Sequence, residues 1–211
     1  MDSKLSYFLY YCLNFVIYGS MITAMGPIIP YFSEITGEPE PYYSFLFFSR
    51  ALGYVAGGSL VKVLMVKLTL HKVLAGATFF GGIFFVLSTL SLTFWNLFIT
   101  LFFGTACCCI INVTCNVCVM KLYSGEGQDY WIQLLHLFFG VGGFVGPTIA
   151  SFTGAYCYFY LGIILIVLSP FYLFVHSPEN RRSNQVTEIA NPISFKVEIL
   201  ICTLYLLYIG Q

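Results

Sequence analysis

The sequence predicts an all-α membrane protein with six transmembrane helices followed by part of a seventh. First, 59% of its 211 residues are hydrophobic and only 9% are charged, whereas soluble domains carry about a quarter charged residues. Second, long uncharged runs alternate with short polar segments, and a helix needs roughly 20 apolar residues to cross a bilayer. Third, Lys and Arg fall in alternate loops, as in multi-pass proteins. Together these observations exclude a soluble protein.

The first two spans flank an acidic loop. Residues 5–33 are uncharged and are expected to form one long span, which lacks the small-residue cleavage site of a signal peptide. The loop 34–41 is rich in Glu and Pro and therefore predicts a turn. Residues 42–62 form the second span, in which Arg50 is the only charge before the terminal Lys62.

The next two apolar runs are each too long for a single span. Residues 73–120 are uncharged, and at 1.5 Å per residue they would form a helix more than twice as long as the membrane is thick. A turn is expected near 93–96, where an aromatic residue suited to the interface meets polar residues. The run 130–175 is expected to turn near 154–157 for the same reason. The four resulting spans are about 73–93, 96–120, 130–153 and 157–176.

The chain therefore divides into three regions. Residues 1–176 are expected to form the six-helix bundle. Residues 177–195 are polar and predict a cytoplasmic linker. Residues 196–211 begin another apolar run that is too short to cross a bilayer. We interpret this run as the truncated start of a seventh helix.

The basic residues predict the orientation in the membrane. Acidic side chains without any base mark the loop after the first span, at Glu34, Glu38 and Glu40. Because Lys and Arg collect on the cytoplasmic side, we expect a cytoplasmic N-terminus. We also expect the protein in the plasma membrane rather than in an organelle. The bases on the expected cytoplasmic side are Lys4, Lys62, Lys67, Lys72, Lys121, Arg181, Arg182 and Lys196.

Several functional classes are disfavoured. Nine Lys and Arg balance nine Asp and Glu, so no basic surface is available for nucleic acid. The cysteines lie in apolar runs, and the pair Cys115 and Cys118 lacks the strand and turn of a redox motif, so it is interpreted as packing. We expect no cofactor and no metal site. The spans lack an acid, base or nucleophile pair, so we do not expect an enzyme.

Arg50 is the most unusual residue of the second span. It precedes Gly53 and Gly57, which form a small-xxx-small face for close helix packing. One interpretation makes Arg50 a hydrogen-bonding fork for a substrate or for a carboxylate across a cavity. The other makes it a structural tie to a backbone carbonyl, or a side chain that reaches out to the membrane surface.

Amides in the fourth span form a polar stripe. Asn112 and Asn116 are four residues apart, and Thr105 and Cys108 extend the same face. An amide both donates and accepts hydrogen bonds, which suits a neutral polyhydroxy substrate better than an ion. The competing interpretation is hydrogen bonding between helices.

Further polar candidates lie in the fifth and first spans. Gln133 and His136 are three residues apart, and His136 is interpreted as a neutral hydrogen-bonding group rather than a proton relay. Asn14 is a candidate of the same kind in the first span, with helix packing as the competing interpretation. The six candidate substrate-binding residues are Asn14, Arg50, Asn112, Asn116, Gln133 and His136.

Three separated segments carry a resemblance to a known family. They are Met25-Gly26-Pro27, Phe48-Ser49-Arg50-Ala51-Leu52-Gly53, and the run from Gln133 to Gly140 that leads to Gly146-Pro147. With six spans, they resemble the N-terminal half of a major facilitator superfamily transporter, and are most similar to its sodium-dependent glucose transporter branch. The resemblance implies two inverted three-helix repeats and a sugar or similar polar solute.

The resemblance implies transport of that solute by alternating access, here as the N-terminal half. The expected partners are the lipid bilayer, the solute, and a missing C-terminal half or a second copy of the chain. The alternative is a truncated scaffold that does not transport and binds other membrane proteins through its glycine faces. Those faces are Gly53 with Gly57, and Gly140 with Gly143.

Overall fold

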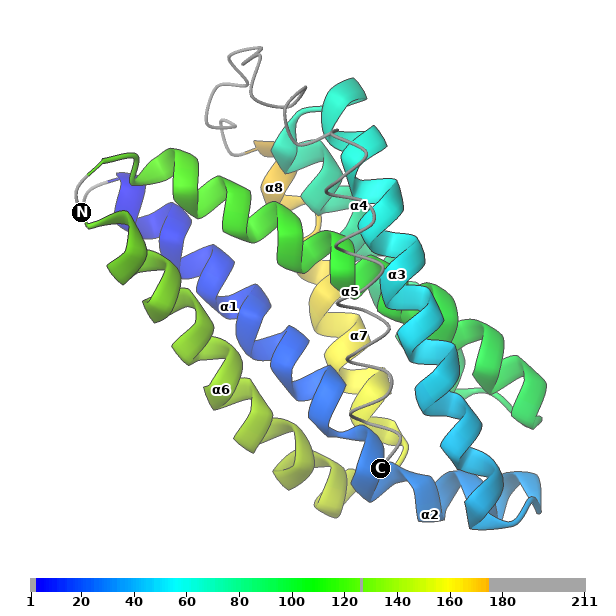
Figure 1. Ribbon diagram of the computed structural model, residues 1–211. Coiled ribbons are helices and arrows are strands. Elements are labelled where there is room, and N and C mark those ends of the chain that lie inside the picture. Colours follow the sequence, from blue (N-terminus) through cyan, green and yellow to red (C-terminus); the bar gives the residue numbers. More distant parts are fainter. Residues whose placement is uncertain (1–2, 126, 175–211) are drawn as a thin grey trace. The chain divides into compact units, whose positions relative to one another are not determined.

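The computed structural model describes residues 3–125 and 127–174, and within them the regular structure is entirely helical (Figure 1). Six helical segments are long and apolar enough to cross a membrane, which confirms the predicted all-α membrane class. The expected linker 177–195 and the expected seventh helix 196–211 lie outside the described residues.

The elements are α1 (Ser3–Thr23), α2 (Met25–Thr36), the 3₁₀ turn η1 (Glu40–Tyr43), α3 (Ser44–Lys67), α4 (Leu70–Thr89), α5 (Phe94–Leu122), α6 (Gln128–Thr153), α7 (Tyr156–Leu168) and α8 (Phe171–Phe174).

The first expected span, 5–33, is divided into two helices. α1 ends at Thr23 and α2 begins at Met25. Pro27 lies in the first turn of α2, where the missing N–H costs little because the first N–H groups of a helix have no partner within it. The same missing N–H deprives the carbonyl of Thr23 of the hydrogen bond that a continuous helix would supply. The break therefore follows from a proline that the expected single span overlooked.

The helices pair in a reciprocal pattern. α1 packs along α6, α3 along α5, and α4 along both α5 and α7. If α1, α3 and α4 form one repeat and α5, α6 and α7 the other, the first helix of each repeat packs on the second helix of the other. The two third helices pack on one another. This is the arrangement that two inverted repeats related by a pseudo-two-fold axis require.

Glycines bring the paired helices together. A Cβ at Gly53 would overlap the carbonyl of Phe102, and one at Gly57 would overlap that of Ala106, so α3 and α5 touch backbone to backbone. This confirms the small-xxx-small face predicted around Gly53, and shows that its partner is α5 of the same chain.

The α1–α6 contact uses different glycines from the expected pair. Gly142 and Gly146 are pressed against the backbone of α1 at Val16 and Ser20. A Cβ at Gly140 would meet nothing within 4 Å, and one at Gly143 would make only an ordinary contact of 3.6 Å with Thr23. Gly140 and Gly143 therefore do not form the close-packing face of α6.

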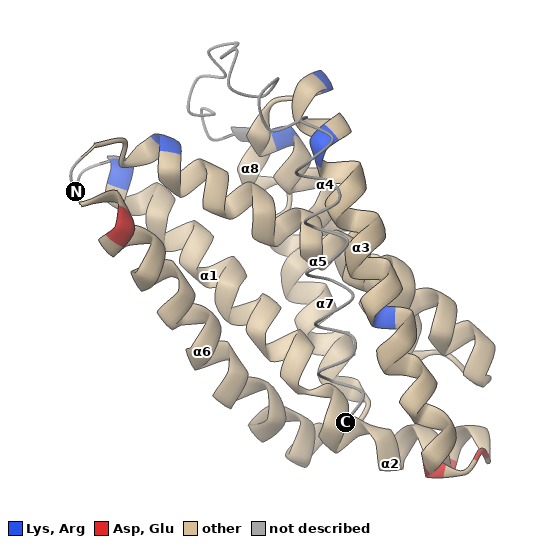
Figure 2. Cartoon of the chain, in the orientation of Figure 1, with Lys and Arg blue, Asp and Glu red and all other residues tan. Residues whose placement is uncertain are grey.

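Charges are distributed unevenly along the bundle. Figure 2 shows Lys and Arg gathered where α1 and α4 begin and α3 ends, apart from one basic residue within α3. That residue is Arg50, the only charged side chain in the middle of a span among the described residues. The opposite end carries the acidic segment between α2 and α3.

Candidate functional site

A chain of hydrogen bonds joins three helices around Tyr54 of α3. The Asn112 side-chain amide on α5 donates to the hydroxyl of Tyr54 at 2.7 Å. The hydroxyl of Tyr18 on α1 donates to the same oxygen at 3.4 Å. Asn116 donates to the backbone and side-chain oxygens of Asn112 at 2.9 and 3.0 Å. The predicted amide stripe is thus one part of a polar network, which we call the Tyr54 network (Tyr18, Tyr54, Asn112 and Asn116).

The helix contacts explain why these side chains meet. Tyr54 lies between Gly53 and Gly57, where the backbones of α3 and α5 touch, so its ring emerges beside a neighbour that is already close. Asn112 and Asn116 are four residues apart and therefore share one face of α5. Close packing through glycine at this point leaves no bulky side chain to separate the hydroxyl from the amides.

The Tyr54 network retains unused hydrogen-bonding capacity. The oxygen of Tyr54 accepts from two donors, so its own proton remains free to be donated. The side-chain oxygen of Asn116 makes no hydrogen bond within the described residues. Tyr54, Asn112 and Asn116 are half-buried rather than enclosed. The network therefore offers a donor and an acceptor on side chains that are not fully enclosed.

Arg50 lies one helical turn from Tyr54 on the same face of α3. Its Nη2 donates to the backbone carbonyl of Ile22 in the last turn of α1 at 3.1 Å. The preceding carbonyl, of Met21, accepts from Tyr158 of α7 at 3.3 Å. The end of α1 is thus held from two sides. One of the two interpretations of Arg50, a tie to a backbone carbonyl, is seen directly, but it occupies one of the five guanidinium N–H groups.

Gln133 and His136 lie on α6, outside the Tyr54 network. Both side chains are exposed, and within the described residues no hydrogen bond joins either of them to Asn112 or Asn116. The ring of His136 packs edge-on against Phe15 of α1 at 5.5 Å, and Phe15 in turn packs against Tyr18 at 6.0 Å. The structure therefore connects His136 to the network only through aromatic contacts.

Asn14 lies apart from the other candidates. It is completely buried, and its amide nitrogen donates to the backbone oxygen of Tyr10 at 3.2 Å and to the hydroxyl of Tyr172 on α8. These contacts join α1 to α8, which fits the packing interpretation of this residue.

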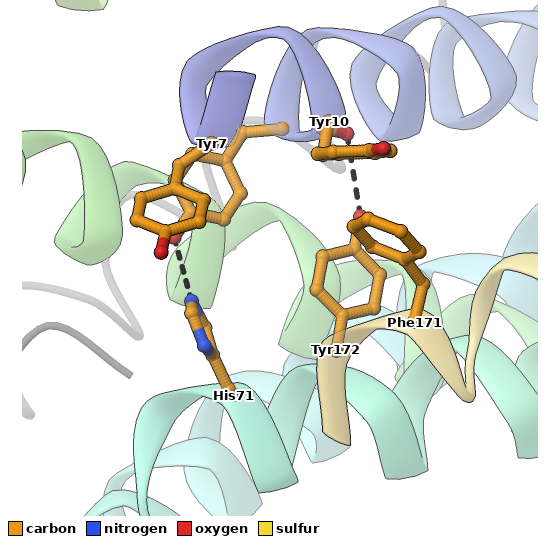
Figure 3. Close-up of a pocket in the computed structure, with 6 residues that line it drawn as sticks. Tyr7, Tyr10, His71, Phe171 and Tyr172 are labelled. Atoms are coloured by element: carbon orange, nitrogen blue, oxygen red, sulfur yellow. Dashed lines mark hydrogen bonds between the residues drawn. The ribbon is translucent and has the colours of Figure 1, made fainter. Parts of the chain in front are cut away.

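Next to Asn14 is a second buried polar cluster that the sequence did not suggest. The hydroxyl of Tyr11 on α1 and Nε2 of His71 on α4 are 2.7 Å apart, and both residues are at most 2% exposed. Figure 3 shows His71, Tyr172 and Phe171 facing Tyr7 and Tyr10 across a narrow crevice. We call Tyr11, Asn14, His71 and Tyr172 the His71 cluster.

Tyrosine hydroxyls are the members of the Tyr54 network that sequence reasoning missed. Tyr18 and Tyr54 stand in apolar runs, where a tyrosine reads as a large hydrophobic or interfacial residue. The available signal was the position of Tyr54, four residues after Arg50 and between two packing glycines. That spacing places its hydroxyl on the polar side of α3.

The comparison with known protein families agrees with this architecture. The sequence description of the Major Facilitator Superfamily matches residues 11–209. A search of curated proteins gave no match. The match covers most of the sequence, and the described residues form six apolar helices that pair as inverted repeats. The chain belongs to the Major Facilitator Superfamily and is a multi-pass membrane transporter.

Proposed function

We propose that the chain forms the N-terminal half of a transporter that moves a small, sugar-like polar solute by alternating access. The observation that carries this proposal is the Tyr54 network, in which hydroxyl and amide groups from α1, α3 and α5 converge. Amides and hydroxyls that both donate and accept suit a solute with several hydroxyl groups. The similarity of three segments to the sodium-dependent glucose transporter branch supports the same substrate class.

Within this proposal each candidate residue has a defined place. Tyr54, Asn112 and Asn116 contact the solute. Gln133 and His136 reach it from α6, on whose exposed side they lie. Asn14 is left out of the solute site because it is completely buried and bonded to Tyr10 and Tyr172.

The wider setting of the transporter is also a proposal. A second six-helix half, or a second copy of this chain, would complete the cavity, because alternating access requires two halves that move against each other. The gathering of bases at the end of the bundle where α1 begins supports a cytoplasmic N-terminus. We further propose that the protein lies in the plasma membrane.

The alternative function, a scaffold that binds other membrane proteins through two glycine faces, loses one of those faces. Gly53 and Gly57 are both buried against α5 of the same chain, so they are not available to another protein. Gly140 remains exposed, so the α6 face is the surface that this alternative retains.

Binding of D-glucose to the purified protein in lipid nanodiscs tests the proposal. Tyr54→Phe and Asn112→Ala each remove a polar group from the network, and each is expected to weaken binding about tenfold, since a hydrogen bond contributes about 1 kcal/mol or somewhat more. Tyr160→Phe and Asn96→Ala are matched controls, because both side chains are exposed and lie away from the network. Equal binding by all four variants, or no binding by the wild type, would contradict the proposed solute.

A further inference from the structure

Two helices, α1 and α3, each contribute two groups, one turn apart, to a single polar column, and α5 contributes Asn112. The first layer of the column holds Tyr18, Tyr54 and Asn112, which are hydrogen-bonded. The second layer lies four residues after Tyr18 on α1 and four residues before Tyr54 on α3. There the carbonyl of Ile22 accepts a hydrogen bond from Arg50. Because residues four apart share one face of a helix, the guanidinium follows the Tyr54 network directly along the column.

The charge of Arg50 has no carboxylate to balance it among the described residues. The acidic residues there stand near helix ends or in the loop after α2, and none forms an ion pair with Arg50; they are Glu34, Glu38, Glu40 and Asp129. The carbonyl of Ile22 satisfies one N–H group, and four donors of the guanidinium fork remain. A charged group inside a span is costly unless it is paired or faces water. The charge and four donors of Arg50 are therefore available to an anion.

We propose that Arg50 binds the carboxylate of the transported solute, which makes the substrate a hydroxylated carboxylate such as a sugar acid. The inference rests on the proposed function and narrows its substrate class. The hydroxyl groups of the solute contact Tyr54, Asn112 and Asn116, and the carboxylate lies against the remaining fork of the guanidinium. Arginine suits this role because its planar donors match the two oxygens of a carboxylate.

The spacing of the column fits such a molecule. The four residues from Arg50 to Tyr54 correspond to a rise of about 6 Å along the backbone of α3. A carbon skeleton of about five or six atoms, with bonds of about 1.5 Å, spans that length between its carboxylate and its distal hydroxyl. A neutral sugar fills the Tyr54 layer but leaves the guanidinium without its anion.

Glucuronate and glucose form a matched pair of probes, since they differ in whether the last carbon atom is a carboxylate. With the wild-type chain in nanodiscs, we expect glucuronate to bind at least about tenfold more tightly than glucose. Arg50→Gln should remove that preference by weakening glucuronate binding about 10- to 100-fold while changing glucose binding less than about threefold. Arg50→Lys keeps the charge but not the fork, and should retain part of the preference. Lys67→Gln, an exposed base at the end of the same helix, should change neither affinity.

Three outcomes would overturn the inference. Equal wild-type affinity for the two probes would show that the site does not select a carboxylate. Equal weakening of both probes by Arg50→Gln and by Arg50→Lys would show that Arg50 only holds α1, or pairs with an acidic side chain of a partner. If glucose binds in a Tyr54-dependent way under either outcome, the proposed function survives and the inference alone fails. If neither probe binds, both fail together.

Discussion

Gly82 of α4 and Gly162 of α7 are in mutual contact, each against the backbone of the other. A Cβ at Gly82 would lie 2.6 Å from the carbonyl oxygen of Gly162, and a Cβ at Gly162 would lie 2.7 Å from that of Gly82. A reciprocal contact of this kind is expected where a two-fold axis passes between two helices. Because α4 and α7 are the third helices of the two repeats, these glycines mark the pseudo-symmetry of the bundle.

Alanine at either glycine is expected to destabilise the protein. The added methyl group would overlap a backbone oxygen that cannot rotate away, and overpacking typically costs about 1–3 kcal/mol. Gly82→Ala and Gly162→Ala should therefore each lower the free energy of unfolding by about that amount, measured by SDS-induced unfolding in mixed micelles. Gly76→Ala is the matched control on α4, since a Cβ there meets nothing within 4 Å. A loss of stability in Gly76→Ala as large as in Gly82→Ala would mean that helix contact is not the cause.

The glycine contacts also show how far the sequence predicts this fold. Uncharged runs and a 30 Å membrane are enough to predict six spans, because the length requirement is physical and local. The spacing of Gly53 and Gly57 correctly predicts a packing face. On α6 the same reasoning selected Gly140 and Gly143, whereas Gly142 and Gly146 make the contact. α6 carries several glycines, and which of them face α1 depends on the rotation of the helix about its axis.

The candidate site was predicted less completely for the same reason. Asn112 and Asn116 could be selected as candidates because polar groups are conspicuous in an apolar span. The hydroxyl of Tyr54 was not found, since its role depends on which way the ring points after α3 meets α5. Asn14 is the opposite case, a polar residue that is conspicuous in the sequence but buried in the structure. Its burial against α8 depends on tertiary packing, which the sequence pattern of α1 does not indicate.

Alanine substitutions on α6 should distinguish a glycine that packs against α1 from one that does not. Gly142→Ala would press a methyl group into the backbone of Val16, and is expected to lower the free energy of unfolding by about 1–3 kcal/mol. Gly140→Ala has open space around its Cβ, and should leave stability unchanged or raise it slightly, since alanine favours a helix by up to about 1 kcal/mol. Thermal unfolding of both variants in detergent measures the difference. The opposite ranking would place a different face of α6 against α1.

The His71 cluster is expected to stabilise the end of the bundle where α4 begins. Tyr11→Phe removes one partner of the buried 2.7 Å hydrogen bond to His71, and should lower the free energy of unfolding by about 1–3 kcal/mol. Tyr7→Phe is the control, because Tyr7 lines the same crevice but is only half-buried. A double-mutant cycle with His71→Phe measures the coupling between Tyr11 and His71. A coupling energy of zero would show that the bond contributes nothing to stability.

The proposed orientation predicts which loops face the outside of the cell. Glu38 and Ser124 are both exposed and lie in segments at opposite ends of the bundle, after α2 and after α5. With a cytoplasmic N-terminus, a membrane-impermeant maleimide should label Glu38→Cys in intact cells and Ser124→Cys only after permeabilisation. The wild-type chain is the control for labelling of the native cysteines. Little labelling of it is expected, because the described cysteines other than half-buried Cys107 are buried. Labelling of Ser124→Cys in intact cells would reverse the orientation. Failure of both variants to label until internal membranes are opened would contradict the plasma-membrane location.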